Sequence, residues 1–142
     1  MTVTLTDEAR RLIPLIEAAT DATVRDCVID DDYDRLLVVI KTGEIAQAIG
    51  PGGETVRDLQ DDLDRTVKLV EDAADAETFV ANALAPAAVY NVTISENDDT
   101  IAYVEVDSHD TGVAIGKDGA NIEAARTLAA RHFDIDDIEL TS

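Results

Sequence analysis

The sequence predicts an α+β fold that is built from two consecutive copies of one pattern. The run Ala48-Ile49-Gly50-Pro51-Gly52-Gly53 recurs 66 residues later as Ala114-Ile115-Gly116-Lys117-Asp118-Gly119. The same displacement lays the apolar run 36–40 over 102–106, and residues 56, 59 and 63 over residues 122, 125 and 129. Because the match extends over a strand, a loop and a helix, it indicates a duplicated domain. We expect a first domain over 1–73 and a second over 74–142.

The first copy is predicted to run helix, strand, strand, helix, helix, strand. Thr6 is a candidate N-cap, and the apolar residues after it recur at helical spacing until Pro14, which we expect to disturb the helix. Strands are expected over 24–29 and 35–41, joined by the acidic turn 30–34. A short helix over 42–49 leads into the glycine loop. An amphipathic helix over 54–63 and a strand over 66–71 complete the copy.

The second copy is predicted to repeat this order. We expect a helix over 75–85, strands over 90–95 and 101–107, a short helix beginning near His109, a helix over 120–133 and a strand over 135–140. The joint between the copies, residues 71–77, contains no Gly or Pro. Domains of about 70 residues bury a modest fraction of their surface and are marginally stable alone. We therefore expect the two copies to pack as one rigid unit.

The charge balance is extreme, with 31 Asp and Glu against 11 Lys and Arg and a net charge of −20. The acidic residues are spread through periodic, apolar-rich sequence, which is typical of a globular protein in concentrated salt, where the Debye length falls to about 3 Å. At ordinary salt this charge repels nucleic acid and anionic membranes. The lone Cys27 excludes an internal disulfide. We expect a cytoplasmic protein that does not contact membranes, because the sequence shows no leader and no membrane-spanning run. We also expect a monomer.

The two glycine loops are the strongest candidates for a functional site. A Gly-x-x-Gly turn between helices lets the chain reverse tightly and leaves backbone N–H groups bare at the start of the next helix. That helix end favours phosphate, and the missing side chains let a sugar-phosphate backbone approach. The alternative is that these glycines only shape a turn between helices.

At these residues the chain resembles the archaeal NusA-like transcription factors, which consist of two tandem type II KH domains. The most specific stretches are Asn82-Ala83-Leu84-Ala85-Pro86-Ala87 and the run from Ala114 to Ile122. The resemblance covers essentially the whole chain. It implies RNA binding by the Gly-x-x-Gly loops, association with transcription, and a role in termination or antitermination. The implied partners are single-stranded nascent RNA and RNA polymerase.

The candidate RNA-binding residues lie in and beside the two loops. Bases are expected to lie over the aliphatic side chains of this set. Each domain also has one cation, which stands on the helix after the loop in the first domain and within the loop in the second. In the first domain the set is Ile49, Gly50, Pro51, Gly52, Gly53, Val56 and Arg57, and in the second it is Ile115, Gly116, Lys117, Asp118, Gly119, Asn121 and Ile122.

Competing chemistries fit the sequence less well. The run 112–117 is one residue short of a nucleotide phosphate loop, and Asp118 stands where Ser or Thr would hold Mg²⁺. The turn 30–34 imitates the start of a calcium loop, but Arg35 occupies the glycine position. We therefore predict no enzymatic activity, no cofactor and no metal. Two alternatives stay open: an adaptor on RNA polymerase or ribosomal proteins with little RNA affinity, and a ribosome-assembly factor.

Overall fold

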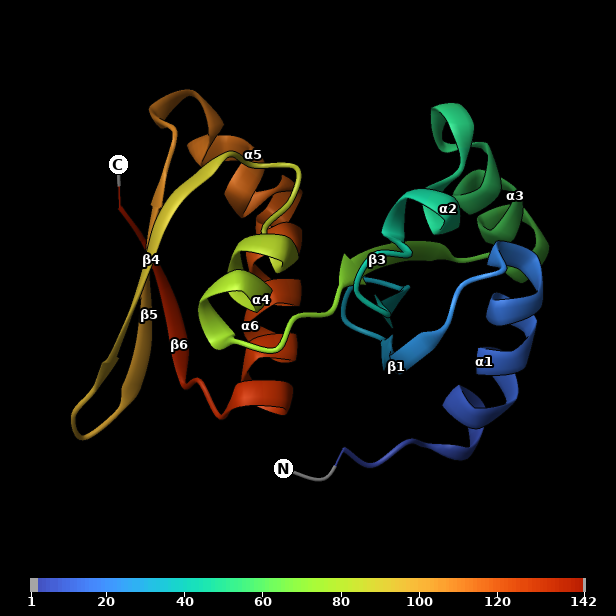
Figure 1. Ribbon diagram of the computed structural model, residues 1–142, viewed down its shortest axis with the longest axis horizontal. Helices are drawn as coiled ribbons and strands as arrows, with labels where there is room; N and C mark the ends of the chain where they lie inside the picture. Colours follow the sequence, from blue (N-terminus) through green and yellow to red (C-terminus); the bar gives the residue numbers. More distant parts are fainter. Residues whose placement is uncertain (1–2, 142) are drawn as a thin grey trace. The chain divides into compact units, whose positions relative to one another are not determined.

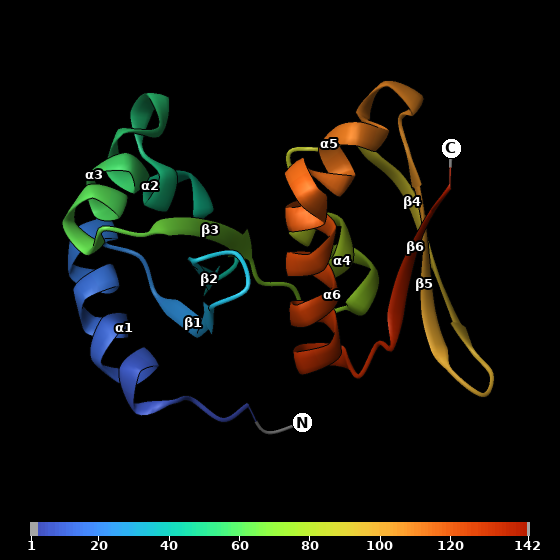
Figure 2. The same ribbon diagram turned by 180° about the vertical axis from the view of Figure 1, so that it is seen from behind.

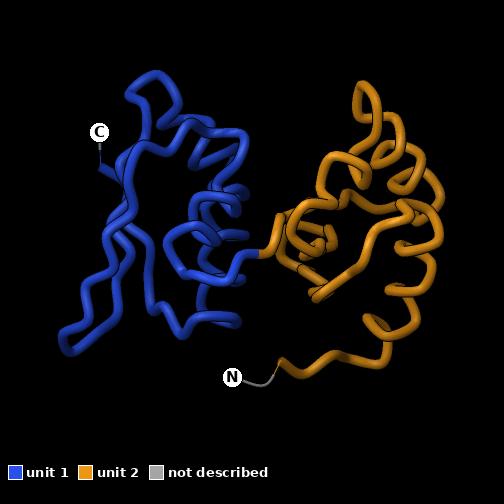
Figure 3. Tube along the Cα trace, in the orientation of Figure 1, with its two compact units in different colours: residues 1, 73–142 blue, residues 2–72 orange. Residues whose placement is uncertain are grey.

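Each half of the chain folds around a three-stranded sheet with helices on one face (Figure 1, and from behind in Figure 2). The computed structural model describes residues 3–141. It divides the chain into two compact units, residues 3–72 and 73–141, coloured orange and blue in Figure 3. Two tandem α+β domains of the same element order confirm the predicted fold class.

The first unit has the predicted order of elements. These are α1 (Asp7–Thr20), β1 (Val24–Asp30), β2 (Arg35–Ile40), α2 (Ile45–Ile49), a 3₁₀ turn (Pro51–Gly53), α3 (Glu54–Leu63) and β3 (Thr66–Glu71). Strand β2 lies in the middle of the sheet, antiparallel to β1 and parallel to β3. The parallel pair needs a crossover, and the α2–loop–α3 hairpin supplies it. This connection positions the first glycine loop.

The second unit repeats this topology. Its elements are α4 (Ala76–Ala83), β4 (Val89–Glu96), β5 (Thr100–Val106), a 3₁₀ turn (Ser108–Asp110), α5 (Thr111–Ile115), a 3₁₀ turn (Lys117–Gly119), α6 (Ala120–Phe133) and β6 (Asp137–Thr141). Strand β5 is antiparallel to β4 and parallel to β6. The crossover between β5 and β6 holds the second glycine loop.

Aliphatic side chains fill both cores, as the scarcity of aromatic residues requires. In the first unit, Ile16 and Leu59 from the helices pack with Leu36, Val38 and Ile40 from β2. In the second unit the fully buried residues include Phe79, Val80, Ala102, Val104, Leu128 and Ile138. The ring of Phe79 lies 5.2 Å from the ring of Phe133, measured between centroids. Along β5 the buried residues 102, 104 and 106 alternate with the exposed residues 103 and 105, and this alternation fixes the register of the strand.

Three local predictions were wrong. Helix α1 continues through Pro14, because buried residues on both sides of it, Ala9 and Ile16, hold the two halves in place. Helix α2 begins at Ile45 rather than at residue 42, since Gly43 has a φ of +88° and its N–H donates to Glu71 Oε2 at 2.9 Å. His109 lies in a 3₁₀ turn, and α5 begins after it.

The last strand also begins later than predicted, at Asp137 instead of residue 135. Ile135 is buried, but the N–H of Asp136 donates to Thr100 O at 2.8 Å in a connection that precedes the ladder. Sequence alternation cannot separate such a buried connection from a strand. Thr6 does cap α1, since its Oγ1 accepts from Ala9 N–H at 3.1 Å.

Candidate nucleic-acid interface

The two glycine loops have the same backbone conformation. Gly50 has φ 79° and ψ 167°, and Gly116 has φ 79° and ψ 171°. The third position of each loop is left-handed, with φ 61° at Gly52 and φ 55° at Asp118. The duplicated sequence motif therefore corresponds to a duplicated local structure, even though the two middle residues differ.

The first glycine of each loop is required by close packing against the following helix. A Cβ at Gly50 would lie 2.2 Å from Thr55 Oγ1, and a Cβ at Gly116 would lie 2.8 Å from the Cβ of Asn121. In contrast, a Cβ at Gly52 would meet no atom within 4 Å. Both loops are thus tightly packed at their first glycine, and the first loop is open at its third position, Gly52.

Some loop N–H groups close the turn, and others do not. In the first loop the N–H of Gly53 donates to Gly50 O at 3.0 Å. In the second loop the N–H of Gly119 donates to Gly116 O at 3.1 Å. Within residues 3–141 the structure gives no intramolecular acceptor to the N–H of Gly52 or of Lys117. These two donors stand just before the first turns of α3 and α6, where the helix dipole favours an anion.

The aliphatic residues of the predicted site separate into two groups. Ile49 and Ile115, which precede the loops, are each 40% exposed although they are large apolar side chains. Val56 is half-buried. Ile122 is only 6% exposed and belongs to the second core. Its side chain is therefore not at the surface, although the sequence predicted that a base would lie on it. The structure therefore offers one exposed isoleucine beside each loop.

The two loops carry their cations differently. Arg57 Nη1 donates to Gly52 O at 2.7 Å, so this guanidinium lies against the first loop itself. In the second loop Lys117 is exposed at the turn. Each cation has acidic neighbours in the sequence, Asp58 after Arg57 and Asp118 after Lys117. Neither loop is therefore a strongly basic groove.

Asn121 has an internal role that sequence reasoning missed. Its Nδ2 donates to Leu84 O and to Ala114 O, each at 3.1 Å. These carbonyls lie just after α4 and within α5, so the amide ties three helices together beside the second loop. No pattern in the sequence marks this, because Leu84 and Asn121 are brought together only by folding.

The other acidic clusters do not form an evident metal centre. Asp30 accepts from Arg35 Nε at 2.8 Å, and this ion pair occupies the start of the calcium-like turn. Asp61 and Asp64 line an open polar hollow of about 380 Å³ that also includes Arg65. Among the described residues, no group of three or more His, Cys, Asp or Glu side chains is placed to hold a metal ion. No helix among them is long and apolar enough to cross a membrane.

Known protein families and relatives match nearly the whole length of this chain. Residues 15–74 match the KH domain family, and residues 76–142 match the NusA-like second KH domain family. A protein of Halobacterium salinarum named "Probable transcription termination protein NusA" is 62% identical over 141 residues, covering 99% of this chain and 100% of the relative. A protein of the same name from Halococcus morrhuae is 60% identical over 140 residues, covering 99% of each chain.

A solved structure is also similar. The structure titled "Crystal structure of APE1850" superposes with a TM-score of 0.84 and 28% sequence identity, covering 96% of this chain and 100% of that chain. The matched families are KH domains rather than enzyme domains. Both named relatives come from halophiles, in agreement with the acidic composition.

Proposed function

The chain belongs to the NusA-like transcription termination proteins with two KH domains, and from this premise we propose that it holds single-stranded transcript RNA on both of its glycine loops, in termination or antitermination. The observation that carries the proposal is the shared loop conformation. The third residue of each loop, Gly52 or Asp118, is exposed, and each loop is followed by a helix of at least 10 residues. An exposed isoleucine precedes each loop.

In this proposal phosphate groups accept hydrogen bonds from the N–H groups of Gly52 and Lys117. Neither N–H has an acceptor within residues 3–141. The dipoles of α3 and α6 favour the negative charge at that point. KH domains hold about four nucleotides in this way. The cations Arg57 and Lys117 lie beside the phosphate path, one on the helix and one in the loop.

The bases would lie on Ile49 and Ile115, which suits a chain with only 4% aromatic residues. Asn121 and Ile122 act differently in this proposal. Because the Asn121 amide is bonded to two carbonyls and Ile122 is buried, both position the second loop instead of touching RNA. RNA polymerase remains a proposed partner, for which the names of the relatives are the support.

The test replaces the open face of each loop with negative charge. The variant combines Pro51→Asp and Gly52→Asp with Lys117→Asp. The backbone tolerates Asp at position 52, since Asp118 already occupies the equivalent left-handed position of the second loop. We expect loss of binding to a single-stranded RNA in molar KCl, measured by fluorescence anisotropy.

A matched control carries Arg10→Glu and Arg11→Glu on α1, which makes the same change in net charge at exposed residues outside both loop sequences. We expect it to bind RNA like the wild type. If the control loses binding as strongly, total charge and not the loops governs affinity. If the wild type binds no RNA at any salt concentration, the proposal fails and the adaptor function is favoured.

A further inference from the structure

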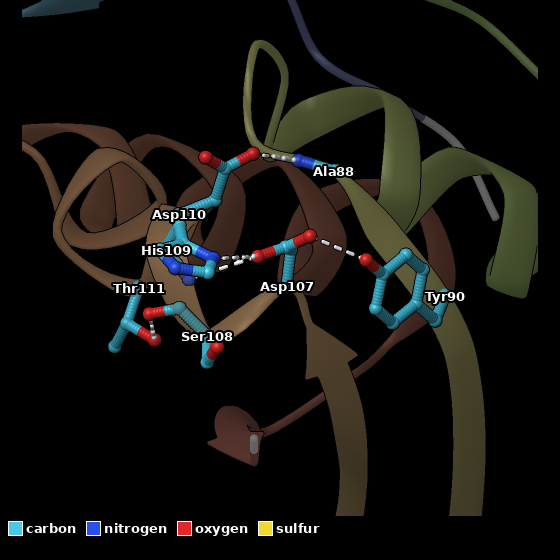
Figure 4. A network of polar contacts seen from close by, with 7 residues as sticks. All are labelled: Ala88, Tyr90, Asp107, Ser108, His109, Asp110 and Thr111. Carbon is cyan, nitrogen blue, oxygen red and sulfur yellow. Dashed lines mark hydrogen bonds and ion pairs between the residues drawn. The ribbon is translucent and has the colours of Figure 1, made fainter.

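Tyr90 is an exposed aromatic residue at a fixed position on the second domain. It is 64% exposed, more than any other large hydrophobic side chain of the described chain. It lies at a bulge of β4, between Val89 and Asn91, where the register with β5 shifts. Its hydroxyl donates a hydrogen bond to Asp107 Oδ2 (Figure 4). The ring is therefore held in one orientation and faces solvent.

The carboxylates near this ring are also held in place. Asp107 Oδ1 accepts from the backbone N–H of His109 at 2.8 Å and lies 3.1 Å from its ring Nδ1. Asp110 Oδ2 accepts from the N–H of Ala88 at 2.8 Å (Figure 4). These bonds hold Asp107 and Asp110 in place near Tyr90.

Three carboxylates act on the phenol of Tyr90. The hydrogen bond to Asp107 raises the pKa of the Tyr90 phenol, and the charges of Asp107, Asp110 and Glu105 act in the same direction. Within residues 3–141, none of these three carboxylates forms an ion pair with Lys or Arg. We refer to Tyr90, Glu105, Asp107 and Asp110 as the Tyr90 corner.

The backbone part of this corner is a property of the fold, because the first domain has it too. There the N–H of Thr23 donates to Glu44 Oε1 at 2.6 Å, as the N–H of Ala88 donates to Asp110. The carboxylate in front of the short helix thus anchors the start of the edge strand in both domains.

The aromatic and acidic parts are specific to the second domain. The first sheet has the same bulge, between Val24 and Asp26, and Arg25 occupies the position of Tyr90. Lys41 follows β2 where Asp107 follows β5. Because the first domain folds with two cations at these positions, the fold does not require Tyr90 or Asp107. Their combination needs another explanation.

We propose that the Tyr90 corner binds an arginine-bearing segment of a protein partner. A guanidinium can stack on an exposed tyrosine ring and donate to neighbouring carboxylates at the same time. The carboxylates disfavour an RNA phosphate and match a cationic partner. In concentrated salt simple ion pairs are screened, whereas stacking of the weakly hydrated guanidinium on the ring is retained. The corner therefore combines two contacts that select arginine over lysine.

The test titrates the ¹⁵N-labelled full chain in molar KCl with a glycine peptide that contains two arginines. We expect shifted amide resonances around positions 90, 105, 107 and 109, and weaker binding of the corresponding lysine peptide. Tyr90→Leu, which keeps apolar bulk but removes the ring, should weaken the arginine peptide about two- to five-fold, the equivalent of an exposed cation–π contact. Tyr90→Phe should retain most of the affinity.

Matched charge variants complete the test. Asp107→Asn should weaken binding, whereas Asp98→Asn in the exposed turn between β4 and β5, with the same change in net charge, should not. Equal weakening by both, or no effect of Tyr90→Leu, would overturn the inference. Shifts at Tyr90 with an oligouridine instead of the peptide would assign the corner to RNA. The loop variant described above should still bind the peptide, so the two proposals fail independently.

Discussion

At the scale of single residues, the structure separates positions that pack from positions that face outward. Gly50 must lack a side chain because Thr55 fills the space beside it, whereas Gly52 faces open space. Asp118 shows that a non-glycine residue can adopt the left-handed conformation at the third position of such a loop. The same distinction applies to Ile115, which is exposed, and Ile122, which is buried seven residues later.

Lys68 gives a residue-scale prediction about pH. Burial lowers the pKa of Lys68 from 10.5 to about 8, with the charge of Arg35 acting in the same direction. Between these values the unfolded chain binds more protons than the folded one, so the free energy of unfolding should rise with pH. The slope is at most about 1.4 kcal/mol per pH unit. Denaturant unfolding between about pH 8 and pH 9.5 measures it.

The controls for this effect are two methionine substitutions. Lys68→Met should abolish the rise, and Lys41→Met, at an exposed lysine, should leave it unchanged. A wild-type stability that is flat or falling over this interval would show that Lys68 is charged in the folded protein with its ordinary affinity for protons.

At the scale of elements, the second helical hairpin depends on one amide. Asn121 on α6 is bonded to carbonyls that belong to α5 and to the residue after α4. The three elements are far apart in the sequence, and the two hydrogen bonds fix where α5 ends and the glycine loop begins. In the first domain Thr55 stands at the same place after the loop, where its side chain packs against Gly50.

We expect Asn121→Ala to lower the free energy of unfolding by about 1–3 kcal/mol, because two partly buried carbonyls lose their donor. The control is Asn97→Ala, which removes an exposed amide that is bonded to Ser95 Oγ and should change stability by less than about 0.5 kcal/mol. Denaturant unfolding in molar KCl provides the comparison. Equal effects of the two substitutions would mean that the Asn121 bonds do not hold the helices.

At the scale of the whole molecule, the net charge of −20 opposes the proposed binding of RNA at low salt. Repulsion between this charge and RNA is long-ranged at low salt and is screened when the Debye length falls to about 3 Å. In the proposed complex, backbone N–H contacts with phosphate and apolar contacts with bases persist in concentrated salt. The proposed ion pairs of the two cations with phosphate contribute little there.

We therefore predict that the affinity for single-stranded RNA stays level or rises from low to molar KCl. Even if Arg57 and Lys117 each neutralised a phosphate, counterion release from a single strand would give a logarithmic slope of only about −1.4. Loss of repulsion acts in the opposite direction. Anisotropy titrations over a KCl series test this, and a steep fall in affinity would show that ion pairs with phosphate dominate binding.

The sequence by itself determined the duplicated pattern, the order of helices and strands, the place of both glycine loops and the excess of negative charge. These properties follow from short-range periodicity, turn-forming residues and composition, all of which can be seen in one dimension. Only the tertiary structure decided that Ile122 is buried, that Asn121 ties three helices together, and that Tyr90 meets Asp107. Each of these depends on residues that are distant in the chain and that chain folding alone brings together.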